Sequence, residues 1–290
     1  MTTRYIDPSG NNSTGDGTIG SPWYDLFYAI DNSSSTDTII VNEGTYLATI
    51  GAVFTSISDR TIISENDKAS ETIIDFINVN FDRVGSSVNG NISGITFKSI
   101  RPSASNKASF DKFIGTIIRK CIFDDCASGS AVRGRGGLFS ECNTKLSNCL
   151  FKNCFNEFGT ESGIITSSGD ADFNTDIENC TVFFDGSLVT TGFFMPSAFI
   201  YYGDGGDDVV RTANVKNTIV SIINSSANFN FSITTGTNSS STVEYSCLHN
   251  TDYDGSDTGV ITLDPKFIDP ANGFFELKPS SPCIGTGTIA

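Results

Sequence analysis

A weak repeat with a period near 30 residues is the feature that most constrains the fold of this chain. Six segments share one pattern: an apolar residue, two mostly polar residues, then Cys, Ile or Thr, and then further apolar residues. They are NISGITF (91–97), TIIRKCIF (116–123), TKLSNCLF (144–151), DIENCTVF (176–183), NVKNTIVS (214–221) and, fitting more loosely, VEYSCLH (243–249). The aligned positions are Ile95, Cys121, Cys149, Cys180, Thr218 and Cys247, at steps of 26, 28, 31, 38 and 29 residues.

This period, with residues that favour β-strands at each repeat, predicts a parallel β-solenoid in which each repeat forms one turn. Helical spacing is absent, and so are the signatures of leucine-rich and ankyrin repeats. In such a coil, equivalent residues of successive turns stack about 4.8 Å apart. We therefore predict an all-β fold: a single parallel β-helix of about eight turns with a short N-terminal capping helix.

The cysteines fit this coil as small buried side chains. Six of the eight occupy the repeat in two rows: Cys121, Cys149, Cys180 and Cys247 at the aligned position, and Cys126 and Cys154 five residues after Cys121 and Cys149. We expect inert core thiols, with a disulfide between neighbouring turns as the alternative. A zinc site is disfavoured, because structural zinc needs cysteine pairs that converge on one point and not a ladder along an axis.

Asparagines precede several of these positions. Asn148, Asn179 and Asn217 each stand one residue before the aligned position, and Asn153 stands one before Cys154. Asn tolerates left-handed backbone angles and can pair its amide with an Asn of the next turn. The pattern predicts a bend of the coil at each of these residues.

Composition narrows the classes of partner. The chain has 28 Gly, 23 Phe and 2 Met, and its formal net charge is −15. With so few cations to release phosphate counterions, we expect no nucleic-acid partner and no anionic membrane surface. The N-terminus MTTRYIDPSG has no basic and apolar regions of a secretory signal, so we expect a chain made in a reducing cytosol, with its cysteines as thiols.

The two ends differ from the repeat and predict covers for the coil. Residues 1–37 form the expected N-terminal cap, with an amphipathic helix over WYDLFYAID (23–31); residues 38–263 form the β-helix, and residues 264–290 form a C-terminal closing segment. Within DTIIVNEGTYLA (37–48) we expect a strand, a turn at Asn42–Gly44 and a second strand at Thr45–Ala48.

These ends also carry a family resemblance. The run YIDPSG…GDGTIGSPW…LFYAID…DTIIVNEGTY resembles the N-terminal signature of right-handed parallel β-helix proteins of the pectin-lyase-like group, and DPKFIDPANGFFELKPSSPCIGTGT (264–288) resembles their closing segment. The resemblance, with the repeat, covers nearly the whole chain and implies a right-handed coil. It is specific for fold and weak for function, because the group includes lyases, hydrolases, epimerases, phage tailspikes and non-enzymatic shells.

The resemblance implies two kinds of catalytic set. Its lyases hold calcium with Asp and Glu and use Arg or Lys as base, whereas its hydrolases use two or three close carboxylates. Asn174–Thr175–Asp176 and Asp207–Asp208 loosely resemble polygalacturonase motifs, but the Gly-His-Gly and Arg-Ile-Lys motifs are absent, and a chance match is favoured. If the chain is an enzyme, the candidates for carboxylate and cationic roles are Asp204, Asp207, Asp208 and Arg211.

Two acidic groups have structural readings. Asp124 and Asp125 would meet Lys98 and Lys152 of neighbouring turns, which predicts ion pairs on a solvated face. Asp252, Asp254 and Asp257 are spaced like oxygen ligands of a calcium loop, but no bidentate Glu follows them. We favour an acidic turn, keep calcium as the alternative, and expect no other cofactor.

Three functional readings remain. The first is a structural phage virion protein, a capsid decoration or small spike, in which a homotrimer of β-helices meets a capsid or tail protein and forms its interface through Phe193, Phe194, Phe199, Tyr201 and Tyr202. The alternative is a polysaccharide lyase or glycoside hydrolase acting on an acidic glycan, including a receptor-degrading tailspike. The third is a cell-surface adhesin whose export signal is missing. Because no catalytic set is complete, the non-enzymatic virion reading is the main prediction.

Overall fold

The structure is a computed structural model of the 290-residue chain. It describes residues 1–48, 57, 59–77, 85–101, 110–128, 137–156, 163–167, 172–188, 198–202, 209–225, 229–234, 238–253 and 257–288.

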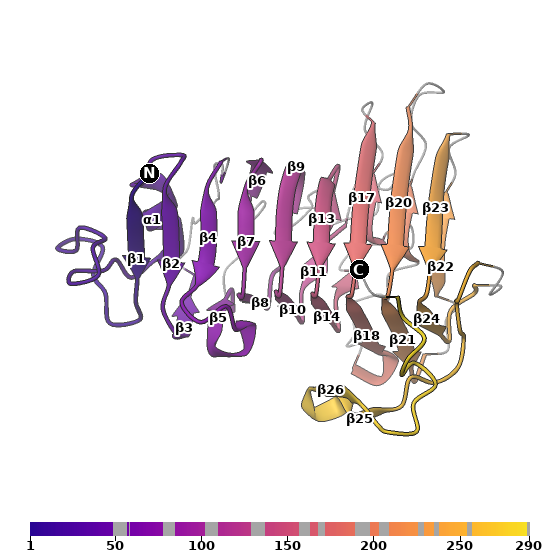
Figure 1. The fold of residues 1–290 in the computed structure, drawn as a ribbon. Coiled ribbons are helices and arrows are strands. Elements are labelled where there is room, and N and C mark those ends of the chain that lie inside the picture. The colour runs from indigo at the N-terminus through magenta and orange to yellow at the C-terminus, as the bar shows by residue number, and fades with distance from the viewer. Residues whose placement is uncertain are drawn as a thin grey trace.

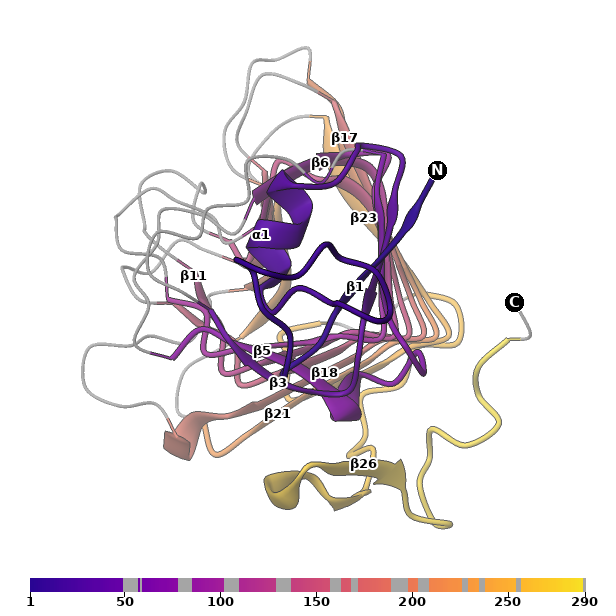
Figure 2. The same ribbon diagram turned by 90° about the vertical axis from the view of Figure 1, so that its left-hand side faces the viewer.

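The chain winds into a parallel β-helix whose coils contribute strands to three rows (Figures 1 and 2). The first row consists of β1 (Thr3–Ile6), β2 (Thr38–Val41), β4 (Thr61–Ser64), β7 (Asn91–Ser93), β9 (Phe110–Arg119), β13 (Asn143–Ser147), β17 (Phe173–Glu178), β20 (Arg211–Lys216) and β23 (Ser239–Glu244). The second row consists of β3 (Gly44–Leu47), β5 (Thr72–Asp75), β8 (Thr96–Lys98), β10 (Ile122–Asp124), β14 (Leu150–Lys152), β18 (Thr181–Asp185), β21 (Ile219–Ile223) and β24 (Cys247–His249). The third row consists of β6 (Gly85–Val88), the first half of β9, β12 (Phe139–Ser140), β16 (Gly163–Ser167), β19 (Ala198–Tyr202) and β22 (Asn230–Thr234).

Neighbouring strands within each row pair in parallel, so equivalent residues of the repeat stack on one another. Ile122 of β10 pairs with Leu150 of β14, and Leu150 pairs with Thr181 of β18. The short strands β11 (Ala127–Ser128) and β15 (Phe155–Asn156) add a further parallel pair. The predicted all-β parallel β-helix is therefore confirmed.

The corner between the first and second rows, called the first corner below, turns at one residue with left-handed backbone angles. Asn148, Asn179 and Asn217 occupy it with φ values of 53°, 53° and 51°, and Asn153 marks the next corner with a φ of 49°. The predicted bends are confirmed. Lys120 takes the same first-corner position with a φ of 50°, although lysine is not a turn-forming residue.

The interior of the coil is filled by rings and thiols. Phe97, Phe123 and Phe151 stack in successive coils with ring centroids 5.6 and 5.0 Å apart. Each is fully buried, and burying a phenylalanine side chain contributes about 1.5–3 kcal/mol. The predicted core thiols are confirmed for the repeat cysteines, because Cys121, Cys126, Cys149, Cys154 and Cys180 are free and buried. Burial raises the pKa of the Cys121, Cys154 and Cys180 thiols well above the usual value, so these thiols stay protonated.

The N-terminal end of the coil is covered by helix α1 (Leu26–Asp31). The helix begins three residues later than the predicted start at Trp23, because Asp25 is its N-cap and accepts a hydrogen bond from the backbone N–H of Tyr28 at 2.9 Å. The helix buries Leu26, Phe27, Ala29 and Ile30 against the first coil. Figure 2 shows α1 lying across the open end of the coil.

The C-terminal segment turns back and lies outside the second row (Figure 1). It forms the antiparallel strands β25 (Phe267–Asp269) and β26 (Phe274–Leu277), joined by a 3-10 turn at Pro270–Asn272. Rings of Phe267 and Phe275 contact the ring of Phe183 in β18, at centroid distances of 6.2 and 5.2 Å. Farther along, the backbone N–H of Thr288 donates to the side-chain amide oxygen of Asn217 at 2.9 Å.

Two further 3-10 turns occur at Ala69–Glu71 and Gly186–Leu188. Among the described residues, no helix has the length and apolar character that crossing a bilayer requires.

Candidate functional site: a groove along the first corner

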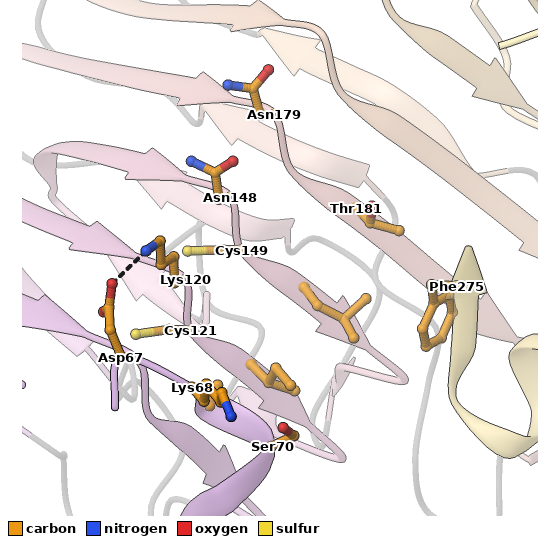
Figure 3. A pocket seen from close by; sticks show the side chains of 13 residues that line it. Asp67, Lys68, Ser70, Lys120, Cys121, Asn148, Cys149, Asn179, Thr181 and Phe275 are labelled. Atoms are coloured by element: carbon orange, nitrogen blue, oxygen red, sulfur yellow. Dashed lines mark hydrogen bonds and ion pairs between the residues drawn. The ribbon is translucent and has the colours of Figure 1, made fainter. Parts of the chain in front are cut away.

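A groove of about 430 Å³ follows the outside of the first corner and is closed on one side by β26 (Figure 3). Its lining combines charged and amide side chains with one aromatic ring. The lining residues are Asp67, Lys68, Ala69, Ser70, Lys120, Cys121, Ile122, Asn148, Cys149, Leu150, Asn179, Thr181 and Phe275. We call this the corner groove.

Three successive coils each place one polar corner residue in this groove: Lys120, Asn148 and Asn179. Their backbone N–H groups donate to first-row carbonyls of the next coil, from Lys120 to Ser147 at 3.0 Å and from Asn148 to Glu178 at 3.0 Å. The corner is thus held by the coil itself, and the side chains are free to face outward. Equivalent atoms of these residues recur at the coil spacing of about 4.8 Å.

The cations of the groove are exposed and paired. Lys120 forms an ion pair with Asp67, and the Lys68 ammonium lies 3.1 Å from the Glu71 carboxylate. The side chains of Lys68 and Lys120 are 60% and 54% exposed, so both can reach a ligand in the groove.

Asp67 is held as a carboxylate. Burial by itself raises the pKa of Asp67, but hydrogen bonds from Lys120 and Ser93 outweigh it, and the net effect is a pKa below the usual range. A group that stays ionised at neutral pH can bind cations or accept protons, but it cannot serve there as a general acid.

The amides of Asn148 and Asn179 do not form the predicted Asn–Asn ladder. In the part of the chain that the structure describes, no hydrogen bond joins these two side chains, and Figure 3 shows Lys120, Asn148 and Asn179 following one another from coil to coil. The amide of Asn217, one coil farther on, is occupied, since it donates to the Thr288 carbonyl at 3.1 Å. The left-handed backbone therefore explains these asparagines better than amide pairing does.

The proposed acidic loop was the first sequence-based candidate site. Asp204, Asp207 and Asp208 lie outside the described residues. Arg211 begins β20 and is 1% exposed, and its Nε donates to Ser167 Oγ at 3.1 Å. Arg211 points into the coil because alternate residues of β20 do so, and its cationic role stays a prediction.

The sequence predicts an interface at five aromatic residues between positions 193 and 202. Phe193, Phe194 and the side chain of Tyr201 lie outside the described residues. Phe199 and Tyr202 are 0% and 1% exposed, so the predicted interface role is wrong for both. They belong to β19, a strand of the coil wall, and Tyr202 donates its hydroxyl to the Thr212 carbonyl at 2.9 Å.

The prediction for Asp124 and Asp125 holds for the first of them. Asp124 pairs in register with Lys98 and Lys152, and the Lys152 ammonium lies 3.4 Å from the Asp124 carboxylate, so this ion pair is confirmed. Asp125 instead pairs with Arg101 at 2.7 Å.

Asn174–Thr175–Asp176 divides between the two faces of β17. Thr175 points inward and donates to the Cys142 carbonyl at 2.9 Å, while Asp176 accepts a hydrogen bond from Asn214 at 2.9 Å on the outer face. These contacts bind neighbouring coils to each other.

The calcium alternative stays a prediction. Asp252 and Asp257 are exposed, and Asp257 accepts a hydrogen bond from the Tyr253 hydroxyl, while Asp254 lies outside the described residues. Within the described ranges, no group of three or more His, Cys, Asp or Glu side chains is placed to hold a metal ion.

The corner groove was only half visible in the sequence. Asn148 and Asn179 were identified as bends, not as ligand-binding groups. Lys120 stands one residue before Cys121, the same offset as these asparagines, so the repeat alignment contained the signal. Phe275 carried no signal, because its contact with the groove depends on how the C-terminal segment folds back.

No family model matches this chain, and no curated protein matches its sequence. Solved structures do match. A crystal structure of the pectate lyase Pel9A is 14% identical with a TM-score of 0.50, over 100% of this chain and 92% of that one. A rhamnogalacturonan lyase is 12% identical over 96% and 94% of the two chains with a TM-score of 0.46, and a pectin methylesterase from Aspergillus niger in deglycosylated form is 12% identical over 89% and 87% with a TM-score of 0.48. At these identities, the likeness to Pel9A shows a shared parallel β-helix fold.

Proposed function

We propose that this chain is a polysaccharide-active β-helix protein that binds an acidic glycan along the corner groove. The observation that carries the proposal is the row of Lys120, Asn148 and Asn179, which presents polar groups at a regular spacing along the coil axis. A linear polymer that lies along this axis meets a new side chain at each coil. The fold shared with a protein named as a pectate lyase supports the same class of ligand.

The residue types suit a sugar polymer that carries carboxylates. Lys68 and Lys120 pair with carboxylates, and the amides of Asn148 and Asn179 donate to and accept from hydroxyls. Phe275 supplies an apolar face for a sugar ring at the side wall. Because the whole chain has a net charge of −15, affinity for an acidic glycan must come from these local cations.

If the groove also cleaves its ligand, its residues favour elimination over hydrolysis. Glycoside hydrolysis uses one protonated and one ionised carboxyl group. Asp67 is the one carboxylate among the described lining residues, and its lowered pKa keeps it ionised. Elimination needs a cation close to the sugar carboxylate and a base that takes the proton, and the groove supplies cations in Lys68 and Lys120 and an ionised proton acceptor in Asp67.

Calorimetric titration of oligogalacturonate into the protein tests this proposal, with a neutral oligosaccharide of equal length for comparison. We expect binding of the acidic ligand alone, weakening as salt rises. Lys120→Asn places in this coil the residue that already occupies the same corner in the next two coils, and we expect about a tenfold loss of affinity, which corresponds to about 1.4 kcal/mol. The appearance of unsaturated products and of new reducing ends distinguishes elimination from hydrolysis.

Lys112→Gln is the matched control. Lys112 is as exposed as Lys68, at 59%, and is also paired with a carboxylate, Glu141, but it lies outside the groove. The Lys112→Gln variant should bind oligogalacturonate with the same affinity as the unaltered protein. Absence of binding for every acidic glycan tried, or an equal loss in the Lys112 variant, would overturn the proposal.

The phage virion reading stays a second, separate proposal. Its aromatic argument is weakened, since Phe199 and Tyr202 are buried in the coil wall. No feature of the described residues favours a homotrimer over a single coil. The solution mass of the 31.0 kDa chain by light scattering tests it directly, and a stable trimer is the result that would restore it.

A further inference from the structure

A second cavity, of about 510 Å³, lies between the C-terminal segment and the outer face of the second row. Phe183 and Phe267 form its apolar wall, and Ser221, Asp264, Lys266 and Lys278 form its polar wall. It shares no lining residue with the corner groove. We call it the tail cavity.

Ser221 is hydrogen-bonded to the only histidine of the chain. Ser221 of β21 and His249 of β24 are direct neighbours in the parallel register, and Ser221 Oγ lies 3.1 Å from His249 Nδ1. This is the distance at which an imidazole accepts the proton of a serine nucleophile. Ser221 is paired with a strand on both sides, to Phe183 and to His249, and His249 is paired with Ser221, so the contact joins two strands and not a loop.

The imidazole is suited to the role of a base. Burial lowers the pKa of His249 below its usual value, while the negative charge of Asp264 partly opposes this shift. The ring is therefore neutral at neutral pH, and in the tautomer that carries its proton on Nε2, Nδ1 accepts the hydrogen bond of the Ser221 hydroxyl. Asp264 is the carboxylate whose charge stabilises the imidazolium once it forms.

We propose that Ser221 and His249 form a nucleophile–base pair that hydrolyses short-chain acyl esters in the tail cavity. As Ser221 Oγ attacks the ester carbonyl, its proton passes to His249 Nδ1. The carbon–oxygen bond to the alcohol then breaks, and the imidazolium returns the proton to the leaving alkoxide. Water, deprotonated by the same imidazole, hydrolyses the acyl-serine and releases the carboxylic acid and the free serine.

The surroundings select the substrate. Ser221 lines the cavity but is only 2% exposed, so we expect its Oγ to accept a small acyl group such as acetyl in preference to a long chain. Lys266 and Lys278 border the same cavity and provide positive charge for the oxyanion that develops on the carbonyl oxygen. An O-acetyl group on a sugar or other alcohol has the required chemistry.

The experiment measures hydrolysis of p-nitrophenyl acetate, butyrate and octanoate by the full chain. We expect turnover of the acetate, decreasing with acyl length. Ser221→Ala and His249→Gln should each lower kcat/KM for the acetate at least about 100-fold. Ser9→Ala, which lies outside both the tail cavity and the corner groove, should leave the rate unchanged, and melting curves for each variant show whether it is folded.

Labelling with a fluorophosphonate provides a readout that does not depend on turnover. We expect one phosphonate on the peptide containing Ser221, and none in Ser221→Ala. A label on another serine, or acetate hydrolysis that persists in folded Ser221→Ala, would overturn the proposal. The Lys120→Asn variant should retain full ester hydrolysis, so this activity and glycan binding in the corner groove can fail independently of each other.

Discussion

On the outer face of the second row, equivalent residues of successive coils form one ladder, and its two halves differ in character. Seven successive coils place a residue at the same position of this row: Asp75, Lys98, Asp124, Lys152, Phe183, Ser221 and His249. The first four alternate in charge and face water. The last three lie where the C-terminal segment folds back and are apolar or neutral, and Phe183 and Ser221 are each 2% exposed.

The contrast teaches that the residue type at each position of this row depends on whether the C-terminal segment covers it, and not on the strand pairing. Backbone pairing is the same throughout the ladder. A charged residue in water loses no hydration, so alternating ions suit the exposed half at little free-energy cost. Beneath the C-terminal segment the same ions would be desolvated, which costs several kcal/mol for each unpaired charge. The covered half therefore holds a ring, a hydroxyl and a neutral imidazole.

Phe183→Ala should break the covered half most strongly. The substitution removes the ring that contacts Phe267 and Phe275, and we expect the free energy of unfolding to fall by about 3 kcal/mol. Urea denaturation measures this loss. Phe274→Ala is the control from the same segment, because Phe274 is 54% exposed, and its loss should stay within about 0.5 kcal/mol. Equal losses for the two variants would contradict the packing role of Phe183.

His249 should make the covered half sensitive to pH. Its pKa in the folded state is lowered by burial, so the unfolded chain binds a proton more readily. The stability that His249 contributes is complete above its unfolded pKa near 6.5 and decreases as pH falls below that value toward the folded pKa. Urea midpoints of the unaltered protein and of His249→Gln, compared between pH 7.5 and 5.5, should differ more at the higher pH. Parallel curves would show that His249 titrates alike in both states.

Substitutions in the exposed half of the ladder should change the free energy of unfolding only slightly. Asp124 and Lys152 are joined at 3.4 Å, with both side chains 24% exposed, and their coupling energy should be at most about 1 kcal/mol. A double-mutant cycle with Asp124→Asn and Lys152→Gln measures it. Added salt should reduce it further. A coupling above about 2 kcal/mol would place this pair among buried ion pairs and contradict the contrast.

The smallest effect on stability should come from modifying Cys283, which is half-buried in the C-terminal segment. A hydrogen bond with Cys247 lowers the pKa of the Cys283 thiol, whereas burial raises the pKa of Cys121, Cys154 and Cys180. Iodoacetamide should therefore label Cys283 first, with the melting temperature almost unchanged. Mass spectrometry of the labelled peptides identifies the site. Equal labelling of Cys121 at native pH would show that the core opens on the timescale of the reaction.

Features that recur in each coil could be predicted from the sequence. Features that depend on how the C-terminal segment folds back against the coil could not. The asparagine bends, the buried cysteine rows and the Asp124–Lys152 pair follow from residues that recur once in each coil. The hydrogen bond between Ser221 and His249 also joins neighbouring coils, but neither residue recurs, so no pattern marks it.

The errors have a common cause. The repeat step is longest between Cys180 and Thr218, which favours an exposed loop there, yet Phe199 and Tyr202 are buried in β19 and Arg211 is buried at the start of β20. A long polar side chain such as Arg211 gives no sequence signal that it points inward. The tail cavity depends on contacts of Phe183 with residues more than 80 positions away, and only the structure shows them.

The pairing of each strand with its neighbours in adjacent coils has a consequence for how the protein folds. Because the strands of the three rows pair only with strands of adjacent coils, each finished coil is a template for the next one. The helix-covered end leaves the ribosome first, so winding can follow synthesis from one end, with no need to wait for distant partners. This addition of coils ends where the C-terminal segment leaves the coil and folds back along the outside. The segment therefore limits the number of coils, as a chain-terminating unit limits the length of a linear polymer.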